Sequence, residues 1–197
     1  YCYRTACLPS LSVSLARLTV TMKGRVYKFA GVALVLYSLI YGLLTSIPEL
    51  PIIEQSIRNL FYHLSMWFTM VAMMAASFGN AIGYLSKENL QRDIRSVSQA
   101  EVGMLFAILG LVTGMMWAKF TWGAWWTNDP KLNGSAITIL IYLAYFVLRN
   151  AMDDERKRAR ISAVYNIFAF VMTIVFIGIL PRMTDSLHPG NGGNPGF

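Results

Sequence analysis

Charged side chains are scarce in this sequence. Asp, Glu, Lys and Arg together make up 14% of its 197 residues, whereas a soluble globular domain carries about 25%. Hydrophobic residues make up 55% of the chain, and the mean hydropathy is +0.47. This composition excludes an ordinary soluble domain and indicates that lipid surrounds much of the chain.

Cysteine is almost absent as well. Cys2 and Cys7 are the only two cysteines, and they are too few and too close to the N-terminus for a disulfide framework. No Cys-x-x-Cys-His motif occurs, which excludes the usual covalent attachment of c-type haem. The sequence also has no nucleotide-binding glycine loop and no internal repeat of the kind found in many transporters. We therefore expect no ATP hydrolysis by this chain itself.

The net charge of +7 does not indicate a nucleic-acid-binding protein. The basic residues lie in short runs between apolar stretches, whereas nucleic-acid binding requires one continuous basic face or arm. We exclude nucleic acid as a partner on this ground. The basic runs are better interpreted as signals of membrane topology.

Apolar runs predict an all-α integral membrane protein with a bundle of five transmembrane helices. A helix needs about 20 residues to cross about 30 Å of hydrocarbon. The fourth run is the weakest, because its uninterrupted apolar part covers only 136–148, so we expect Arg149 to snorkel to the membrane interface. The predicted spans cover 26–47, 60–85, 101–120, 134–150 and 161–180. The charged segments between the second and third spans and between the fourth and fifth are expected to be solvated connectors.

The distribution of Lys and Arg predicts the orientation of these spans. With the Lys23 end in the cytoplasm, eleven basic residues fall on the cytoplasmic side and four on the other. This bias follows the positive-inside rule and makes the N-terminus cytoplasmic. The outer face then holds three segments: 48–59, a loop at about 121–133, and the residues after Pro181.

Both histidines of the chain fall on this outer face. His63 lies at the start of the second span, and His188 follows the end of the fifth. A single histidine near a membrane interface is usually a polar anchor. Two that are distant in sequence and converge on one side also suit the axial coordination of haem iron by two imidazoles. Tyr62 and Asp185 are both candidates to orient a ring nitrogen.

A tryptophan-rich loop lies between the two histidines in the sequence. Its tryptophans are Trp122, Trp125 and Trp126, with Gly123 between them and an Asp129-Pro stop after them. An aromatic belt at the membrane interface is one interpretation. Three tryptophans within five positions also make a platform on which a flat, apolar macrocycle can stack. The basic residues near this face would balance two propionates: Arg58, Lys119, Lys131 and Arg182.

The segment from 122 to 131 resembles the tryptophan-rich WWD motif of the haem-handling proteins of cytochrome c biogenesis, and within them the CcmC family, the haem exporter proteins C. The supporting segments are 57–63, 148–154 and 186–190, and the similarity covers 22–190. Many members of the family carry Trp where this chain has Asn128, so that rim of the platform is expected to be less aromatic. Six transmembrane helices are expected in a full-length member.

The resemblance also suggests a division of the chain. We interpret 1–21 as a leader that is not native, because Met22 reads like a natural start. Residues 22–190 would form the transmembrane haem-handling domain, with the outer-face tryptophan-rich loop at 119–133. The Gly/Pro-rich tail, 191–197, is expected to be truncated before a sixth helix.

The resemblance implies a haem-transfer component rather than an enzyme. Haem b would be held non-covalently with His63 and His188 as axial ligands, and Trp122, Gly123, Trp125, Trp126, Asp129 and Lys131 would form its cradle. The site would face the periplasm from the bacterial inner membrane. The haem would pass to the haem chaperone CcmE, alongside the CcmD, CcmA and CcmB subunits.

Two other functions remain open at this stage. A cytochrome c haem synthetase of the second biogenesis system shares the tryptophan motif, but it is longer and has more histidines than the two found here. A small-molecule or haem permease would need polar groups along a path through the middle of the membrane. The predicted spans offer few such groups beyond Asn80 and Asn166.

Overall fold

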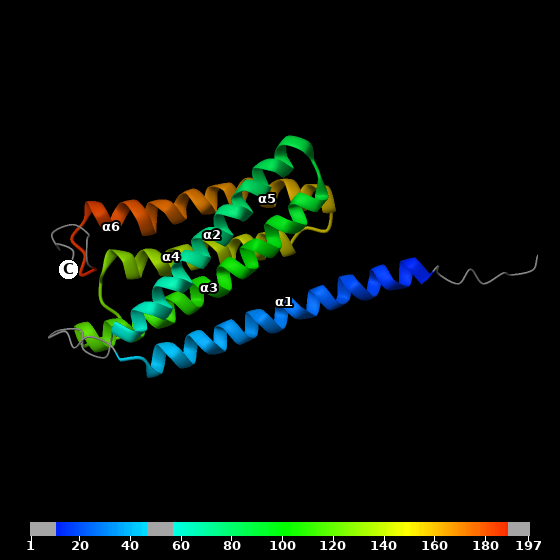
Figure 1. Ribbon diagram of the computed structural model, residues 1–197. Coiled ribbons are helices and arrows are strands. Elements are labelled where there is room, and N and C mark those ends of the chain that lie inside the picture. Colours follow the sequence, from blue (N-terminus) through cyan, green and yellow to red (C-terminus); the bar gives the residue numbers. More distant parts are fainter. Residues whose placement is uncertain (1–10, 47–56, 189–197) are drawn as a thin grey trace, which may run out of the picture. The chain divides into compact units, whose positions relative to one another are not determined.

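The computed structural model describes the backbone of residues 11–46 and 57–188 (Figure 1). Within these ranges all regular structure is helical, and five helical segments are long and apolar enough to cross a membrane. This confirms the predicted all-α membrane fold. The elements are α1 (Leu11–Leu44), α2 (Ile57–Lys87), α3 (Leu90–Trp122), α4 (Pro130–Asn150), α5 (Glu155–Thr173), the π-helical η2 (Ile174–Ile179) and α6 (Leu180–Met183).

Helix α1 forms a unit by itself. Its apolar part, Arg25–Leu44, makes a candidate span with none of its residues buried. The helix runs without a break through Met22, so residues 11–21 of the predicted leader continue it. The first ten residues and the predicted tail, 191–197, lie outside the described part of the chain, and both assignments stay predictions.

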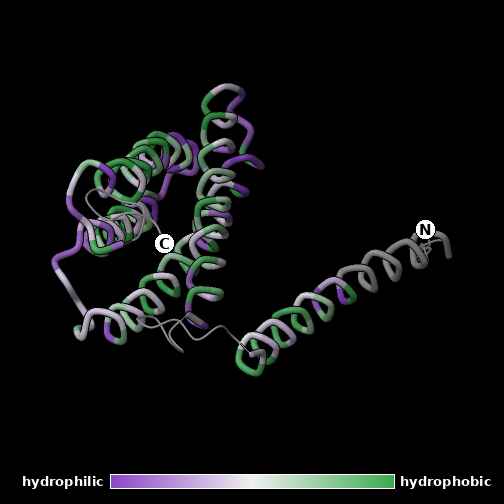
Figure 2. The backbone as a smooth tube through the Cα atoms, turned by 60° about the vertical axis from the view of Figure 1, so that its left-hand side comes forward, coloured by the Kyte–Doolittle hydropathy of each residue, from purple (hydrophilic) through white to green (hydrophobic). Residues whose placement is uncertain are grey.

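The other helices pack into a bundle in which hydrophobic residues run along the helices and hydrophilic ones gather near the connections (Figure 2). Helices α2 and α3 form the most extensive pair, and glycines on α3 allow their close approach. A Cβ at Gly103 would lie 2.9 Å from Met74 Cγ, and one at Gly110 would lie 3.3 Å from Trp67 Nε1. The core beside these contacts is closed by Met70, Tyr142 and Tyr145.

The solvated connector predicted between the second and third spans is mostly helix. Only Glu88 and Asn89 separate α2 from α3, and the Asn89 side chain caps the new helix by accepting from Gln91 N. One face of the first turns of α3 is buried, with Ser96 3% exposed and Ala100 fully covered. The prediction was wrong here because this stretch contains several charged residues, and they make its average composition look like that of a solvated loop although one face of the helix packs on the bundle.

A buried polar cluster joins four helices near the middle of the bundle. The Asn166 side chain donates to Ser77 Oγ at 2.7 Å and to Ser96 Oγ at 3.0 Å, and the Tyr142 hydroxyl donates to Asn166 Oδ1 at 3.4 Å. These hydrogen bonds satisfy the amide inside a low-dielectric environment. Asn166 therefore acts as a packing contact between helices, which weakens the interpretation of this residue as part of a permeation path.

Arg149 does not snorkel to the interface, so that prediction was wrong. Its guanidinium makes two parallel hydrogen bonds to the Asp93 carboxylate, at 2.8 and 2.6 Å. The two side chains are only 11% and 8% exposed. The carboxylate is present because α3 begins eleven residues earlier than the predicted third span, at Leu90. The ion pair joins the start of α3 to the end of α4.

Replacing one member of this pair should strongly destabilise the bundle. Arg149→Leu leaves the Asp93 carboxylate buried without its partner, which costs about 3–5 kcal/mol. Arg95→Leu is the matched control, because Arg95 is exposed on the same helix as Asp93, and it should change stability by about 0.5 kcal/mol or less. Unfolding by SDS in mixed micelles measures both. Equal stabilities of the two variants would contradict a structural role for the pair.

Candidate functional site

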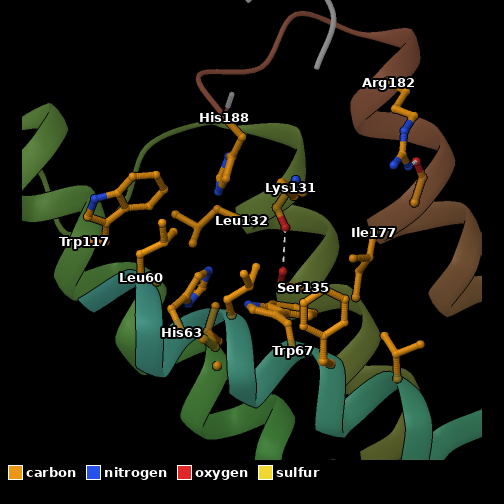
Figure 3. A pocket seen from close by; sticks show the side chains of 17 residues that line it. Leu60, His63, Trp67, Trp117, Lys131, Leu132, Ser135, Ile177, Arg182 and His188 are labelled. Carbon is orange, nitrogen blue, oxygen red and sulfur yellow. Dashed lines mark hydrogen bonds between the residues drawn. The ribbon is translucent and has the colours of Figure 1, made fainter. Parts of the chain in front are cut away.

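A cavity of about 760 Å³ opens at the end of the bundle where α2 begins and α3 ends (Figure 3). Its walls come from α2, α3, α4, η2, α6 and the segment that follows α6. Most of the lining is apolar, and a few polar side chains converge on it. This is the usual composition of a site for a small organic ligand or cofactor. Three of the predicted site residues line it: His63, Lys131 and His188.

His63 enters the cavity from the second turn of α2. Its ring packs against Gly114 of α3, where an added Cβ would lie 2.9 Å from His63 Cε1. Its Nδ1 lies 3.1 Å from the hydroxyl oxygen of Thr113. That hydroxyl donates its hydrogen to a carbonyl of its own helix, Leu109 O at 2.8 Å or Gly110 O at 3.0 Å. With its hydrogen on one of these carbonyls, the hydroxyl has its oxygen available to accept from Nδ1–H, in the tautomer that leaves the lone pair on Nε2.

His188 points into the same cavity from the segment after α6 (Figure 3). Its Nδ1 lies 2.9 Å from Asp129 Oδ1. The other carboxylate oxygen of Asp129 accepts from Ser186 Oγ and from Leu187 N, each at 2.8 Å. Burial by itself raises the pKa of Asp129, but the hydrogen bonds from His188 and Ser186 outweigh it and lower the pKa below its usual value. An ionised carboxylate places the imidazole hydrogen on Nδ1, so the lone pair is on Nε2.

Asp129 also begins helix α4. Its Oδ1 accepts from Lys131 N at 2.9 Å and from Leu132 N at 3.3 Å, and Pro130 occupies the first helical position. Asp at the N-cap followed by Pro is a typical helix start. The residue is 3% exposed and does not itself line the cavity. It joins the tryptophan-rich loop to the segment that carries His188.

Two of the aromatic residues on the cavity wall escaped the sequence-based choice of site residues. Trp67 of α2 and Trp117 of α3 both line the cavity. The ring centroid of His63 lies 6.0 Å from that of Trp67 and 6.4 Å from that of Trp117. Trp122 packs edge-on against His188, with ring centroids 5.1 Å apart, and also contacts Trp117 at 6.0 Å. The short distance in sequence was the available signal, because Trp117 precedes Trp122 by only five residues.

Trp122, Gly123, Trp125 and Trp126 are not among the residues that line the cavity. Trp125 and Trp126 are 53% and 44% exposed. Gly123 ends α3 with φ +81°, a left-handed conformation that favours glycine, and its carbonyl accepts from Lys119 Nζ at 3.0 Å. The segment predicted as a loop, 119–133, is thus the last turn of α3, a short connection and the first turn of α4.

Two cations border the cavity. Lys131 of α4 and Arg182 of α6 both belong to its lining. The Arg182 guanidinium donates to Gly178 O of η2, which holds it near the rim. Arg58 and Lys119, the other predicted cations, are not among the lining residues.

The partners of the two histidines differ from the predicted candidates. Tyr62 and Asp185 were the candidates to orient a ring nitrogen. The structure instead brings Thr113 to Nδ1 of His63 and Asp129 to Nδ1 of His188. Thr113 lies 50 residues from His63 in sequence, and no motif connects them. Asp129 belongs to the tryptophan motif, but its contact with His188 spans 59 positions and depends on the fold of the final segment.

The cavity's donor set fits haem. Each histidine has its Nδ1 within 3.1 Å of an oxygen of the protein, which favours the tautomer with the hydrogen on Nδ1 and the lone pair on Nε2, the usual one of an iron ligand. Indole rings suit the faces of a porphyrin, and the two cations suit its two propionates. The observation that carries the fit is the pair of imidazoles, because no other pair of described residues supplies two nitrogen ligands to this cavity.

Comparison with known proteins places this chain in a family. The sequence model of the CcmC family, described as heme exporter protein C, matches residues 10–191. The heme exporter protein C of Bradyrhizobium diazoefficiens is 30% identical over 110 residues, which cover 55% of this chain and 41% of that protein. That of Escherichia coli is 27% identical over 120 residues, or 61% of this chain and 47% of that protein.

A cytochrome c biogenesis protein, CcsA of Prochlorococcus marinus, is 33% identical over 103 residues, or 52% of this chain and 32% of that protein. The matched region thus spans less than half the length of each of these three relatives. The family match covers the five spans and both cavity histidines. It shows that this chain belongs to the CcmC family of membrane proteins, which handle haem in cytochrome c biogenesis.

Proposed function

We propose that this protein binds haem b non-covalently between His63 and His188 and delivers it to the haem chaperone CcmE during cytochrome c maturation. The observation that carries the proposal is the convergence of these two histidines on one cavity from opposite ends of the bundle's sequence. Two imidazoles are a common axial pair for haem iron. The CcmD, CcmA and CcmB subunits are the proposed partners, because the chain has no nucleotide-binding loop to supply energy itself.

Haem would supply an iron atom with two open axial positions and a flat apolar ring. His63 Nε2 and His188 Nε2 would bind the iron, while Thr113 and Asp129 keep the two rings in the correct tautomer. The indoles of Trp67, Trp117 and Trp122 would shield the porphyrin from water on the side of the bundle.

The rim of the cavity would hold the polar edge of the porphyrin. Lys131 and Arg182 would pair with the propionates in charge-assisted hydrogen bonds. Trp125 and Trp126, which are exposed beyond the cavity, would then contribute to the cradle only at its outer edge. Gly123 supports this arrangement by ending α3 with a sharp turn.

We propose that the protein lies in the bacterial inner membrane with the cavity facing the periplasm. Within the bundle, eight Lys and Arg residues fall at the end that carries the α2–α3 and α4–α5 connections, and four fall at the cavity end. The positive-inside rule puts the more basic end in the cytoplasm. This topology places the N-terminus in the cytoplasm and the haem site in the compartment where c-type cytochromes mature.

A second candidate is a subunit of a cytochrome c haem synthetase, favoured by the similarity to the CcsA protein. Such a subunit would give its haem directly to an apocytochrome. Incubating the haem-loaded protein with purified CcmE and, separately, with an apocytochrome c distinguishes the two functions by the identity of the protein that becomes haem-stained.

Free imidazole should be able to replace the side chain of either histidine as a ligand of the haem iron. His63→Gly or His188→Gly removes one axial ligand and leaves a space the size of the lost ring, so the bound haem should become five-coordinate or water-ligated. Added imidazole should restore the six-coordinate absorption spectrum in both variants. Ser65→Gly, an exposed position two residues further along α2, controls for the glycine itself. Unchanged spectra in both histidine variants would refute the axial assignment.

The tryptophans should divide into two groups. Trp122→Ala removes a ring that packs on His188 and should weaken haem binding by about 0.5–1.5 kcal/mol, roughly 2- to 12-fold. Trp126→Ala, the matched control from the same motif, should weaken it less because this ring lies outside the cavity. Haem titration of the purified variants measures both affinities. A larger loss for Trp126→Ala would mean that the outer loop carries most of the binding.

The proposed topology can be tested by thiol labelling. In a background of Cys2→Ala and Cys7→Ala, single cysteines replace Asn128 and Asp153, which are exposed at the two opposite ends of the bundle. An impermeant maleimide added to intact spheroplasts should label the cysteine at 128, and the one at 153 should react only after lysis. The reverse pattern would place the cavity on the cytoplasmic side.

A further inference from the structure

The two cavity histidines have unlike partners. His188 Nδ1 lies 2.9 Å from a carboxylate oxygen of Asp129, whereas His63 Nδ1 lies 3.1 Å from the neutral hydroxyl of Thr113. A hydrogen bond to a charged acceptor is about twice as strong as one between neutral groups. A carboxylate behind a metal-ligating imidazole also raises the basicity of that ligand. The cavity therefore presents one strengthened nitrogen ligand and one ordinary one.

The fold holds the partner of each histidine in place, beginning with Asp129 next to His188. The Asp129 side chain is fully buried, and four donors of the protein hold its two oxygens: Lys131 N, Leu132 N, Ser186 Oγ and Leu187 N. These bonds give the carboxylate a single position facing His188.

On the other side, the Thr113 hydroxyl is directed at carbonyls of its own helix. Asn59 Nδ2 donates to Thr113 O at 2.6 Å and keeps α2 and α3 together at this point. No carboxylate is among the described residues that line the cavity near His63.

We propose that Asp129 is a positioning residue that makes His188 the retaining ligand of haem, and that His63 is the exchangeable ligand at which transfer to an acceptor begins. This inference rests on the proposed function. In the exchange, His63 leaves with its electron pair on Nε2, and an imidazole of the acceptor takes its place with its own pair. One neutral nitrogen donor replaces another, so no oxidant, reductant or proton is needed.

The order of ligand strength can be measured on the purified protein in detergent, loaded with haem and mixed with excess apomyoglobin as haem acceptor. His63→Gly keeps the ligand backed by the carboxylate, and His188→Gly keeps the one backed by the hydroxyl. Loss of such a partner typically weakens metal binding about 10- to 100-fold. His63→Gly should therefore lose haem at least about tenfold more slowly than His188→Gly.

The effect of Asp129 should depend on which histidine remains. Asp129→Asn keeps a good N-cap residue for α4 but removes the charge. Added to His63→Gly, it should speed haem loss about 10- to 100-fold. Added to His188→Gly it should have little effect, because the carboxylate then faces no ligand. A purely structural Asp129 would give the same change in both backgrounds, and that result would overturn the proposal.

A gain-of-function variant tests the inference without touching Asp129. Thr113→Asp places a carboxylate behind His63 and should slow haem loss from the His188→Gly variant, whereas Thr113→Val should not. In the chain with both histidines, Asp129→Asn should raise the midpoint reduction potential of bound haem, because a carboxylate behind the imidazole favours the ferric state.

The outcomes separate this inference from the proposed function. Equal rates of haem loss from the two glycine variants, together with an unchanged potential in Asp129→Asn, would overturn the inference while leaving two-histidine ligation intact. Glycine variants that both keep the six-coordinate spectrum without added imidazole would refute the ligation itself, and the inference with it.

Discussion

The carboxylate of Asp129 connects the parts of the cavity that are distant in sequence. It caps α4 with one oxygen and holds the segment 186–188 with the other. Because the side chain is buried, each of these donors would lose a strong acceptor if the carboxylate were absent, and a buried unsatisfied donor costs about 1–3 kcal/mol. The position of His188 therefore depends on this single side chain.

The opposite end of the bundle is held by the same kind of interaction. The Asp93–Arg149 pair joins α3 to α4, and the cluster of Ser77, Ser96 and Asn166 links α2, α3 and α5 between the two ends. Lipid provides no hydrophobic force that drives apolar helices together, so close packing and internal hydrogen bonds have to specify the bundle. Glycines such as Gly103 permit the close approach that makes these polar contacts possible.

Much of the architecture could be predicted from the sequence, because a membrane span needs only length and apolar composition. All five spans were found, and His63, His188 and Lys131 do line one cavity. The start of α3 was missed, since a helix that buries charged residues in an ion pair looks like a polar connector when its partner is unknown. Hydropathy reports the average environment of a segment and does not report the pairing of individual side chains.

The site was predicted less completely than the fold. Trp67 has no motif around it, and it reaches the cavity only because α2 packs against α3 at Gly110. Thr113 could not be assigned for the same reason, because its contact with His63 is set by the register between two helices. The difference between His63 and His188 depends on which group lies next to Nδ1 of each ring, and only the three-dimensional structure shows these neighbours.

The π-helical turn between α5 and α6 determines in which direction around the helix axis the residues after it point. In η2 the N–H of Leu180 bonds to Val175 O, five residues back, so this stretch contains one residue more than an α-helix of the same course. Each residue turns an α-helix by about 100°. If one residue were deleted here, the helix would close into a regular α-helix, and Arg182 would keep its place at the rim. A deletion in α5 outside this turn would instead rotate Arg182 away from the cavity. The turn thus makes η2 the one stretch of this span in which a change of chain length is absorbed locally.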